Sequence, residues 1–312
     1  MQNTKILKQF GGKSKAKPGD KLTVGELLSS WGNELQLTLI TGSKGFKRTI
    51  KENRVQKIGL RMIEPDITLD KFTVQILGRT EISYLKKISA SEQQQVLLKL
   101  TSQKIPCLIV TKGIKPPENL VKQCEKAGIP LFRTNLHTGR TISEIRAILE
   151  VRFAPFISAH GVLIDIHRLG VLVLGKSGIG KSECALDLVL RGAKLVVDDL
   201  VEIRRLGASN LVGCSPQNIK HLMEIRGIGI INIKDLVGPT AVMDKREIDM
   251  VIELEHWDPK TEYNRVGDVY DTYEILDVKL PYLKIPVSPG RNISTIVEIA
   301  VRNQIFRQSV SD

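Results

Sequence analysis

The chain is organised around the stretch Gly175-Lys176-Ser177-Gly178-Ile179-Gly180-Lys181-Ser182. This stretch satisfies the pattern G-x-x-x-x-G-K-[ST] at every fixed position. Residues 171–174 before it are apolar and rich in valine, which is typical of a buried strand. Residues 183–190 after it combine good helix formers with apolar residues at helical spacing. A strand, a glycine-rich loop and a helix in this order are the context that a phosphate-binding loop requires.

The chemistry of this loop follows from its glycines. They let the backbone curl so that successive N–H groups point into one concavity, where an anion satisfies them. The following helix adds the positive end of its dipole. Lys181 would reach the outer phosphates, and Ser182 would place its hydroxyl on a magnesium ion. A chance match in an ordinary turn is the alternative, but pattern and flanks both favour a nucleoside phosphate bound by residues 175–182.

Length and composition are those of a soluble globular protein. The 312 residues leave room for two domains, and the chain is 42% hydrophobic and 26% charged. No apolar run approaches the ~20 residues of a membrane helix, and the N-terminus lacks the pattern of a secretory signal. No C-x-x-C pair occurs among the four cysteines, so we expect reduced thiols in a cytoplasmic protein.

Basic residues outnumber acidic ones by 46 to 34, which gives a formal net charge of +12. Such an excess suits an acidic or phosphorylated partner, and it would also suit nucleic acid. The sequence has no zinc-finger spacing, aromatic RNA-binding signature or long basic helix. We therefore expect neither nucleic acid nor a membrane as a partner.

The residue pattern divides the chain into three segments, and it predicts a fold of the α/β class. Residues 1–20 form a lysine- and glycine-rich tail that we expect to be mobile. Residues 21–153 alternate strands and helices and form an accessory α/β domain in which no pattern indicates a reaction. Residues 154–312 form the catalytic P-loop domain, with several hairpins and few helices. Pro155 marks the boundary, because the residue before a proline disfavours helix. The strands expected in the first half are 35–40, 72–77, 107–110 and 129–132.

Two adjacent carboxylates follow the strand predicted at 195–197. Asp198 and Asp199 are close in sequence to the phosphate loop. A carboxylate there can hold magnesium or accept a proton from an attacking hydroxyl. One of the two could instead cap the following turn, but we do not expect both to be idle beside a phosphate site.

The second unusual stretch is Met223-Glu224-Ile225-Arg226-Gly227-Ile228-Gly229-Ile230-Ile231-Asn232. Glu224 and Arg226 lie two apart, so on a strand both would face one side. They could be a plain surface pair, but the glycines beyond them indicate close approach of backbone or ligand. His160, Arg265 and the loop 286–291 are further candidates, each with an ordinary structural alternative.

Together these pieces have an order that resembles the bacterial HPr kinase/phosphorylase family. The resemblance is carried by His160-Gly161, 175–182, Asp198-Asp199, 223–232, Arg265 and 286–291. Its most specific part is the run M-E-I-R-G-x-G-I-I-N. It covers residues 155–312 strongly, whereas the first half matches only in size and α/β character.

The resemblance implies a C-terminal P-loop domain related to phosphoenolpyruvate carboxykinase and an N-terminal domain similar to one of the Mur ligases. It implies a homohexamer that uses ATP or pyrophosphate to phosphorylate a serine of HPr, the phosphocarrier protein of the sugar phosphotransferase system. It also implies phosphorolysis, which consumes inorganic phosphate, releases pyrophosphate and regulates carbon metabolism. Mg²⁺ is the implied cofactor.

Residue roles also come from the resemblance. Asp199 matches the base that takes the serine proton and, in reverse, the acid that returns it. The loop 286–291 matches a segment tied to dephosphorylation. The other active-site matches are His160, Lys181 and Arg265, and the magnesium-ligand matches are Ser182 and Glu224. The sequence does not depart from the family pattern at these positions.

Two other functions stay open. A P-loop kinase for a small molecule would turn over without a protein acceptor. A nucleotide-sensing regulator would bind ATP and then a protein or DNA without transfer chemistry, and the charge of +12 is its best support. Salt-sensitive retention on DNA, with an inert Asp199 variant, would identify that regulator.

Overall fold

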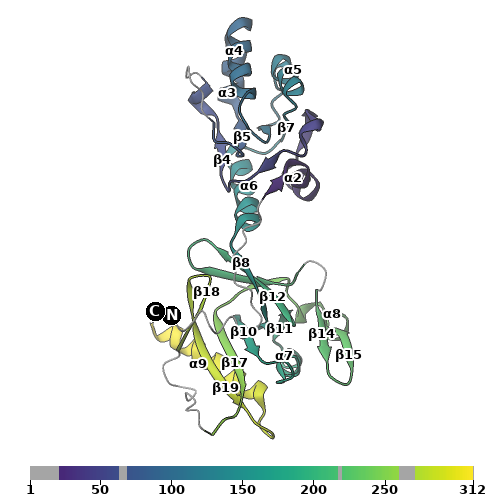
Figure 1. Cartoon of the computed structure of the whole chain (residues 1–312), viewed down its shortest axis with the longest axis vertical. Coiled ribbons are helices and arrows are strands. Elements are labelled where there is room, and N and C mark those ends of the chain that lie inside the picture. Colours follow the sequence, from purple (N-terminus) through teal and green to yellow (C-terminus); the bar gives the residue numbers. More distant parts are fainter. Residues whose placement is uncertain (1–20, 63–68, 217–219, 260–270, 312) are drawn as a thin grey trace. The chain divides into compact units, whose positions relative to one another are not determined.

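The computed structural model describes residues 21–62, 69–216, 220–259 and 271–311 (Figure 1). These residues form two compact units that divide between Ala154 and Pro155. Both units mix helices with sheets, so the α/β class predicted from the sequence is confirmed. Arg265 and the tail 1–20 lie outside the described residues. Within the described part, no helix is long and apolar enough to cross a membrane.

The N-terminal unit is built on a five-stranded sheet in the order β2-β7-β6-β5-β4. Strands β4 to β7 are parallel, and β2 is antiparallel at one edge. Side chains from α3, α4 and α5 cover one face, and those from α2 and α6 cover the other. The strands are β2 (Thr38–Thr41), β4 (Val55–Lys57), β5 (Val74–Leu77), β6 (Leu108–Val110) and β7 (Leu131–Arg133), and β1 (Leu22–Thr23) pairs separately with β3 (Thr49–Ile50). The helices are α2 (Val24–Trp31), α3 (Arg79–Lys87), α4 (Ala90–Thr101), α5 (Glu118–Ala127) and α6 (Thr138–Phe153).

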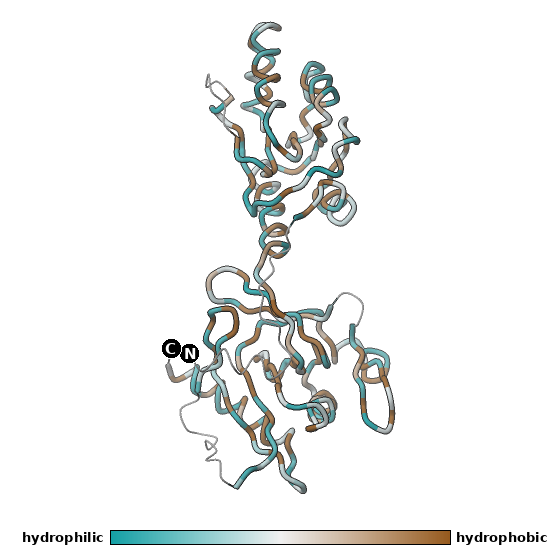
Figure 2. Tube along the Cα trace, in the orientation of Figure 1, coloured by the Kyte–Doolittle hydropathy of each residue, from teal (hydrophilic) through white to brown (hydrophobic). Residues whose placement is uncertain are grey.

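Local sequence explains where these elements begin. Thr23 and Ser89 each accept a hydrogen bond from a backbone N–H in the first turn of α2 and α4, as capping boxes do. Two predicted strands, 35–40 and 72–77, start later than expected, at Thr38 and Val74. The reason is a left-handed backbone at Gln36 (φ 49°) and Phe72 (φ 61°), which a strand cannot contain. Figure 2 shows hydrophobic and hydrophilic residues alternating along α4 and α5.

The C-terminal unit has three sheets. The largest has six strands in the order β11-β9-β10-β17-β19-β18, a second has four in the order β16-β13-β12-β8, and β14 and β15 form a separate hairpin. The strands up to the hairpin are β8 (Phe156–His160), β9 (Val162–Ile166), β10 (Leu169–Gly175), β11 (Lys194–Val197), β12 (Leu200–Leu206), β13 (Asn210–Cys214), β14 (Leu222–Ile225) and β15 (Gly229–Asn232). They are followed by β16 (Lys245–Glu247), β17 (Met250–His256), β18 (Asp271–Ile275) and β19 (Val278–Val287). The helices are α7 (Lys181–Leu190), α8 (Ile233–Leu236) and α9 (Ile293–Ser311).

The central strand β10 places the phosphate loop. Its side chains alternate between two buried clusters: Val171 and Val173 face the layer of α7 and α9, and Leu172 and Leu174 face the four-stranded sheet. Because both faces are covered, the strand is apolar throughout, as the sequence predicted. β10 and β17 run parallel, so their carboxyl ends share one edge, and the loop after Gly175 lies there.

Candidate active site

The loop 175–180 has the curled backbone that phosphate binding needs. Gly175, Gly178 and Gly180 have φ values of 150°, 78° and 101°, which other residues rarely adopt. A Cβ atom on Gly175 would come within 2.7 Å of the Leu254 carbonyl oxygen on β17. Glycine is therefore required at that position by both backbone conformation and space. The loop leads directly into the N-terminus of α7, where an anion is favoured.

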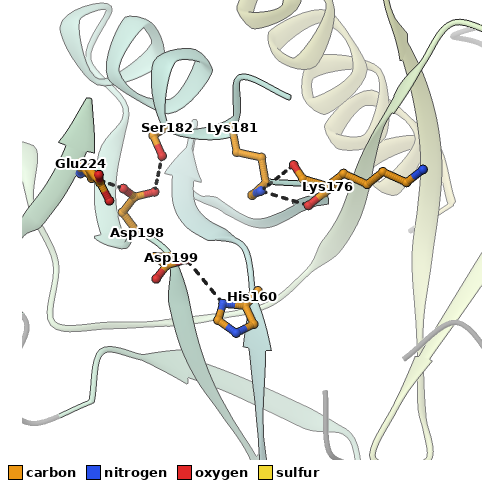
Figure 3. Close-up of polar contacts among 8 residues, drawn as sticks. His160, Lys176, Lys181, Ser182, Asp198, Asp199 and Glu224 are labelled. Atoms are coloured by element: carbon orange, nitrogen blue, oxygen red, sulfur yellow. Dashed lines mark hydrogen bonds and ion pairs between the residues drawn. The ribbon is translucent and has the colours of Figure 1, made fainter. Parts of the chain in front are cut away.

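Lys181, the first residue of α7, points back into this loop (Figure 3). Its Nζ donates hydrogen bonds to the carbonyl oxygens of Gly175 (3.0 Å) and Lys176 (3.1 Å). Burial lowers the pKa of Lys181, and the nearby carboxylates of Asp198 and Asp199 oppose that shift. The ammonium group is thus held within the loop, partly out of water, where it can neutralise phosphate charge.

Asp198 lies at the centre of the polar contacts (Figure 3). Ser182 Oγ donates a hydrogen bond to Asp198 Oδ1 at 2.9 Å, and the Glu224 backbone N–H donates to Asp198 Oδ2 at 3.3 Å. Burial raises the pKa of Asp198, these two hydrogen bonds lower it, and the charge of Asp199 raises it further. The half-buried carboxylate therefore joins α7 to the hairpin of β14 and β15.

Asp199, the next residue along the chain, is exposed to solvent, whereas Asp198 is half-buried. Its side chain is 82% exposed, and its Oδ1 lies 3.4 Å from Nδ1 of His160, the last residue of β8. Its backbone is left-handed, with φ at 73°, and its carbonyl oxygen accepts a hydrogen bond from Gly161 N–H at 2.9 Å. This turn directs consecutive carboxylates to different places. Asp199 is left free to meet an incoming hydroxyl group.

The hairpin formed by residues 223–232 contacts the phosphate loop through Arg226. Met223 and Ile225 are buried in the core, whereas Glu224 between them is exposed. β14 ends at Ile225, so Arg226 lies in the turn rather than on the strand face that the sequence predicted. A Cβ atom on Gly178 would lie 2.8 Å from the Arg226 guanidinium. The cation of this hairpin is therefore positioned against the anion-binding loop.

The stretch 286–291, which the sequence predicted as a loop, begins with the last two residues of β19, Pro286 and Val287. The rest of it leads toward α9, which packs on α7. Ile293 Cδ1 lies 3.9 Å from where a Cβ on Gly180 would stand. Ser294 Oγ donates a hydrogen bond to Asp187 Oδ2 on α7. Asn292 Oδ1 accepts a hydrogen bond from Thr295 N–H at 3.1 Å, as the predicted cap does. The end of this loop is thus fixed beside the start of the phosphate-loop helix.

A magnesium ion fits the donor set at this site. Ser182 and Asp198 bring one hydroxyl and one carboxylate together, and the backbone N–H of Glu224 bonds to the same carboxylate. Mg²⁺ prefers hydroxyl and carboxylate oxygens of this kind. Asp198 forms no ion pair with a lysine or arginine in the described residues, although its charge acts on the nearby Lys181 ammonium. Groups of three His, Cys, Asp or Glu residues that could hold a metal are absent from the described chain. Mg²⁺ needs only one or two carboxylates when substrate phosphates and water complete its shell.

Comparison with known proteins places both units in one family. The HPr Serine kinase N terminus family matches residues 22–149, and the HPr Serine kinase C-terminal domain family matches residues 151–312. The HPr kinase/phosphorylase of Geobacter sulfurreducens is 48% identical over 286 residues, which cover 92% of this chain and 90% of that protein. The chain belongs to the HPr kinase/phosphorylase family.

Other members of the HPr kinase/phosphorylase family are also similar. The protein of Halalkalibacterium halodurans with that name is 42% identical, over 91% of this chain and 90% of its own length. A solved structure of the Hpr(Ser) kinase/phosphatase from Coxiella burnetii is 32% identical, with a TM-score of 0.47. It covers 50% of this chain and 94% of that chain. The two family matches and the sequence identities of 48% and 42% confirm the resemblance drawn from the motifs.

In this member of the HPr kinase/phosphorylase family, most residues predicted from the sequence come together. The residues gathered around the phosphate loop are His160, Lys181, Ser182, Asp199 and Glu224. Arg265 lies outside the described residues, so its place in the site is not described. Two further contributors were candidates in the sequence, where their roles stayed open. They are Asp198, the partner of Ser182, and Arg226, the neighbour of Gly178.

Proposed function

We propose that this chain transfers the γ-phosphoryl group of ATP, or a phosphoryl group of pyrophosphate, to a serine of an HPr-type phosphocarrier protein, and that it also removes that group by phosphorolysis. The observation that carries the proposal is the contrast between Asp198 and Asp199 beside the phosphate loop. A half-buried carboxylate bonded to Ser182 is suited to the nucleotide side. An 82% exposed carboxylate is suited to a hydroxyl delivered on the surface of another protein. Membership of the HPr kinase/phosphorylase family supports HPr as that protein.

In the forward reaction, Asp199 accepts the proton of the serine hydroxyl as its oxygen attacks the γ-phosphorus of ATP. The bond between that phosphorus and the β,γ-bridging oxygen breaks, and ADP leaves. His160, 3.4 Å from Asp199, orients the carboxylate. Lys181 exchanges its loop carbonyls for phosphate oxygens and neutralises the charge that builds up on them.

In the reverse reaction, an oxygen of inorganic phosphate attacks the phosphorus of phosphoserine. The serine oxygen leaves and receives a proton from Asp199, and the product is pyrophosphate. The same cradle of backbone N–H groups serves both directions, because each places two linked phosphate groups over the loop. Asp199 is therefore base in one direction and acid in the other.

The proposal includes Mg²⁺ bound by Ser182 and Glu224, with Asp198 beside them. The ion supplies positive charge to the phosphate oxygens. Arg265 is included as a further cation on the strength of the family pattern alone. We also propose that residues 154–312 are the catalytic domain, that residues 21–153 are accessory, and that the protein is a cytoplasmic homohexamer.

The test uses the full chain, Mg-ATP and purified HPr from the same organism, with the carrier followed by intact mass. HPr is expected to gain the mass of one phosphoryl group. After ATP is removed and inorganic phosphate is added, the mass gain should be lost and pyrophosphate released. Replacement of the acceptor serine in HPr by alanine is the matched control.

Each result has a distinct meaning. A mass gain that inorganic phosphate does not reverse would leave a kinase and contradict the phosphorylase half of the proposal. No mass gain, with Mg-ATP bound normally, would rule out HPr as the acceptor. Turnover of ATP with a small acceptor alone would favour the small-molecule kinase.

A further inference from the structure

A cavity of about 310 Å³ lies in the N-terminal unit, and residues of the edge strand β2, the end of β7 and helix α5 line it. Its apolar floor includes Ile40 of β2 and Val121 of α5, both of which pack against the buried core below. Binding sites for small molecules have volumes of roughly 300–1,000 Å³ and apolar walls. The cavity is therefore large enough for a small ligand.

The rim of this cavity is strongly cationic. Lys115, Lys122 and Arg133 line it, and Glu118 is the single acidic residue that does so. In the described chain, none of these three cations forms a hydrogen bond or ion pair with an acidic side chain, and Glu118 pairs with no cation. This arrangement differs from that of Arg48 in the same unit, whose guanidinium donates to three backbone carbonyls. The rim cations are thus available to a ligand.

The cavity also lies beside the carboxyl ends of two parallel strands, β6 and β7. Arg133 is the last residue of β7, and Lys115 follows the end of the parallel strand β6. Ligands of such sheets occupy the space outside the carboxyl ends of the strands, because loops there can converge on one point. Loops after these strands thus bring Lys115 and Arg133 together at one end of the sheet.

We propose that this cavity binds a phosphate monoester with an apolar or aromatic body. The three cations and Glu118 leave a net charge of +2 at the rim. A phosphate monoester carries close to two negative charges at neutral pH, and a carboxylate carries one, so the monoester matches the rim better. The apolar floor formed by Ile40 and Val121 takes the body of the ligand. This site is separate from the phosphate loop and does not depend on the function proposed above.

The test is calorimetric titration of the full chain with phenyl phosphate, in saturating Mg-AMP-PNP so that the phosphate loop is occupied. Phenyl phosphate is expected to bind, with phenol and inorganic phosphate each about tenfold weaker or more. Arg133→Gln should weaken binding about tenfold, which is the effect of losing one charge-assisted hydrogen bond. Lys122→Gln should weaken it in the same direction.

Lys126→Gln is the matched control, because Lys126 is exposed on the same helix but does not line the cavity. It should leave phenyl phosphate binding unchanged, and all three variants should keep the wild-type melting temperature. Binding that survives both Arg133→Gln and Lys122→Gln would overturn the site. Equal binding of inorganic phosphate would overturn the apolar part of the ligand, and equal binding of phenol would overturn the phosphate part. Absence of phenyl phosphate binding would overturn the proposal as a whole.

Discussion

Ser182 Oγ donates a 2.9 Å hydrogen bond to Asp198 Oδ1, and this bond ties the first turn of α7 to the end of β11. It withdraws Asp198 from the solvent, while Asp199 beside it remains exposed. Two adjacent carboxylates can therefore have separate roles, one at the nucleotide and one at the acceptor. Three predictions concern Asp198, Asp199 and Gly178 in this site, and a fourth concerns the burial of the cysteines.

Replacing Asp198 with asparagine should lower kinase activity by about 10–100-fold, the usual effect of losing a carboxylate next to a metal ligand.

The same change should stabilise the metal-free protein at neutral pH. Burial raises the folded-state pKa of Asp198 above its unfolded value. The folded state then binds more protons than the unfolded state between the two pKa values. The free energy of unfolding of the wild type consequently falls as pH rises through that window. Asparagine does not ionise, so the variant does not lose this stability.

The check on Asp198→Asn is the melting temperature in EDTA as a function of pH. The variant should melt higher than the wild type at pH 7, by about 2–4 °C if the gain is ~1 kcal/mol. The two curves should meet at a pH below 3.8, the ordinary pKa of an aspartic acid, where the wild-type carboxyl is neutral in both states. A variant that is less stable at pH 7 would contradict a desolvated, unpaired charge at this position.

Asp199→Asn should reduce phosphorylation and phosphorolysis alike, by about 10²–10⁴-fold, because one acid–base group serves both directions. Nucleotide affinity should change little, since the Asp199 side chain is exposed and makes no hydrogen bond to the phosphate loop. Both rates and the Kd for ATP are to be measured on the same preparation. His160→Gln should cause a smaller loss, because in the proposed mechanism His160 orients the carboxylate and does not transfer the proton itself. Loss of one direction alone would refute a shared acid–base group.

Gly178→Ala should impair nucleotide binding through Arg226. The added methyl group would lie 2.8 Å from the Arg226 guanidinium, so the arginine must move away from the loop. Gly192→Ala is a matched control, because Gly192 also has a positive φ (103°) but has open space around its Cβ position. Both changes should cost about 1–2 kcal/mol for the left-handed backbone. Only Gly178→Ala should raise the KM for ATP, and equal effects on KM would contradict the contact.

Cysteine alkylation tests the burial of the core. Burial raises the pKa of Cys107 and Cys124 to about 12, and that of the half-buried Cys214 rises as well. Thiolates react with iodoacetamide and thiols do not, so native protein at pH 8 should be alkylated slowly. Peptide mapping should find label first at Cys214. In urea all four cysteines should react quickly, and rapid native labelling of Cys107 would contradict its burial.

The phosphate loop, its helix and the class of the fold could be read directly from the sequence. The loop is local: eight consecutive residues contain its glycines, its lysine and its serine, and the apolar strand before them is continuous. Local patterns need no knowledge of distant contacts, so capping residues such as Ser89 and the apolar alternation of β10 were also predictable. The starts of β2 and β5 were harder to predict. Gln36 and Phe72 adopt a left-handed backbone there, and neither is the glycine that usually indicates such a conformation.

Tertiary structure decides which carboxylate of the active site is half-buried and which is exposed. Asp198 is withdrawn because Ser182, 16 residues earlier, and Glu224, 26 residues later, are folded against it. Arg226 contacts Gly178 only because the hairpin of β14 and β15 packs beside α7. The cationic cavity likewise joins Ile40, Lys115 and Arg133, which three different segments supply. Such contacts depend on how sheets and helices pack, so the sequence determined the loop and its chemistry, and packing alone decided which charges are buried, paired or free.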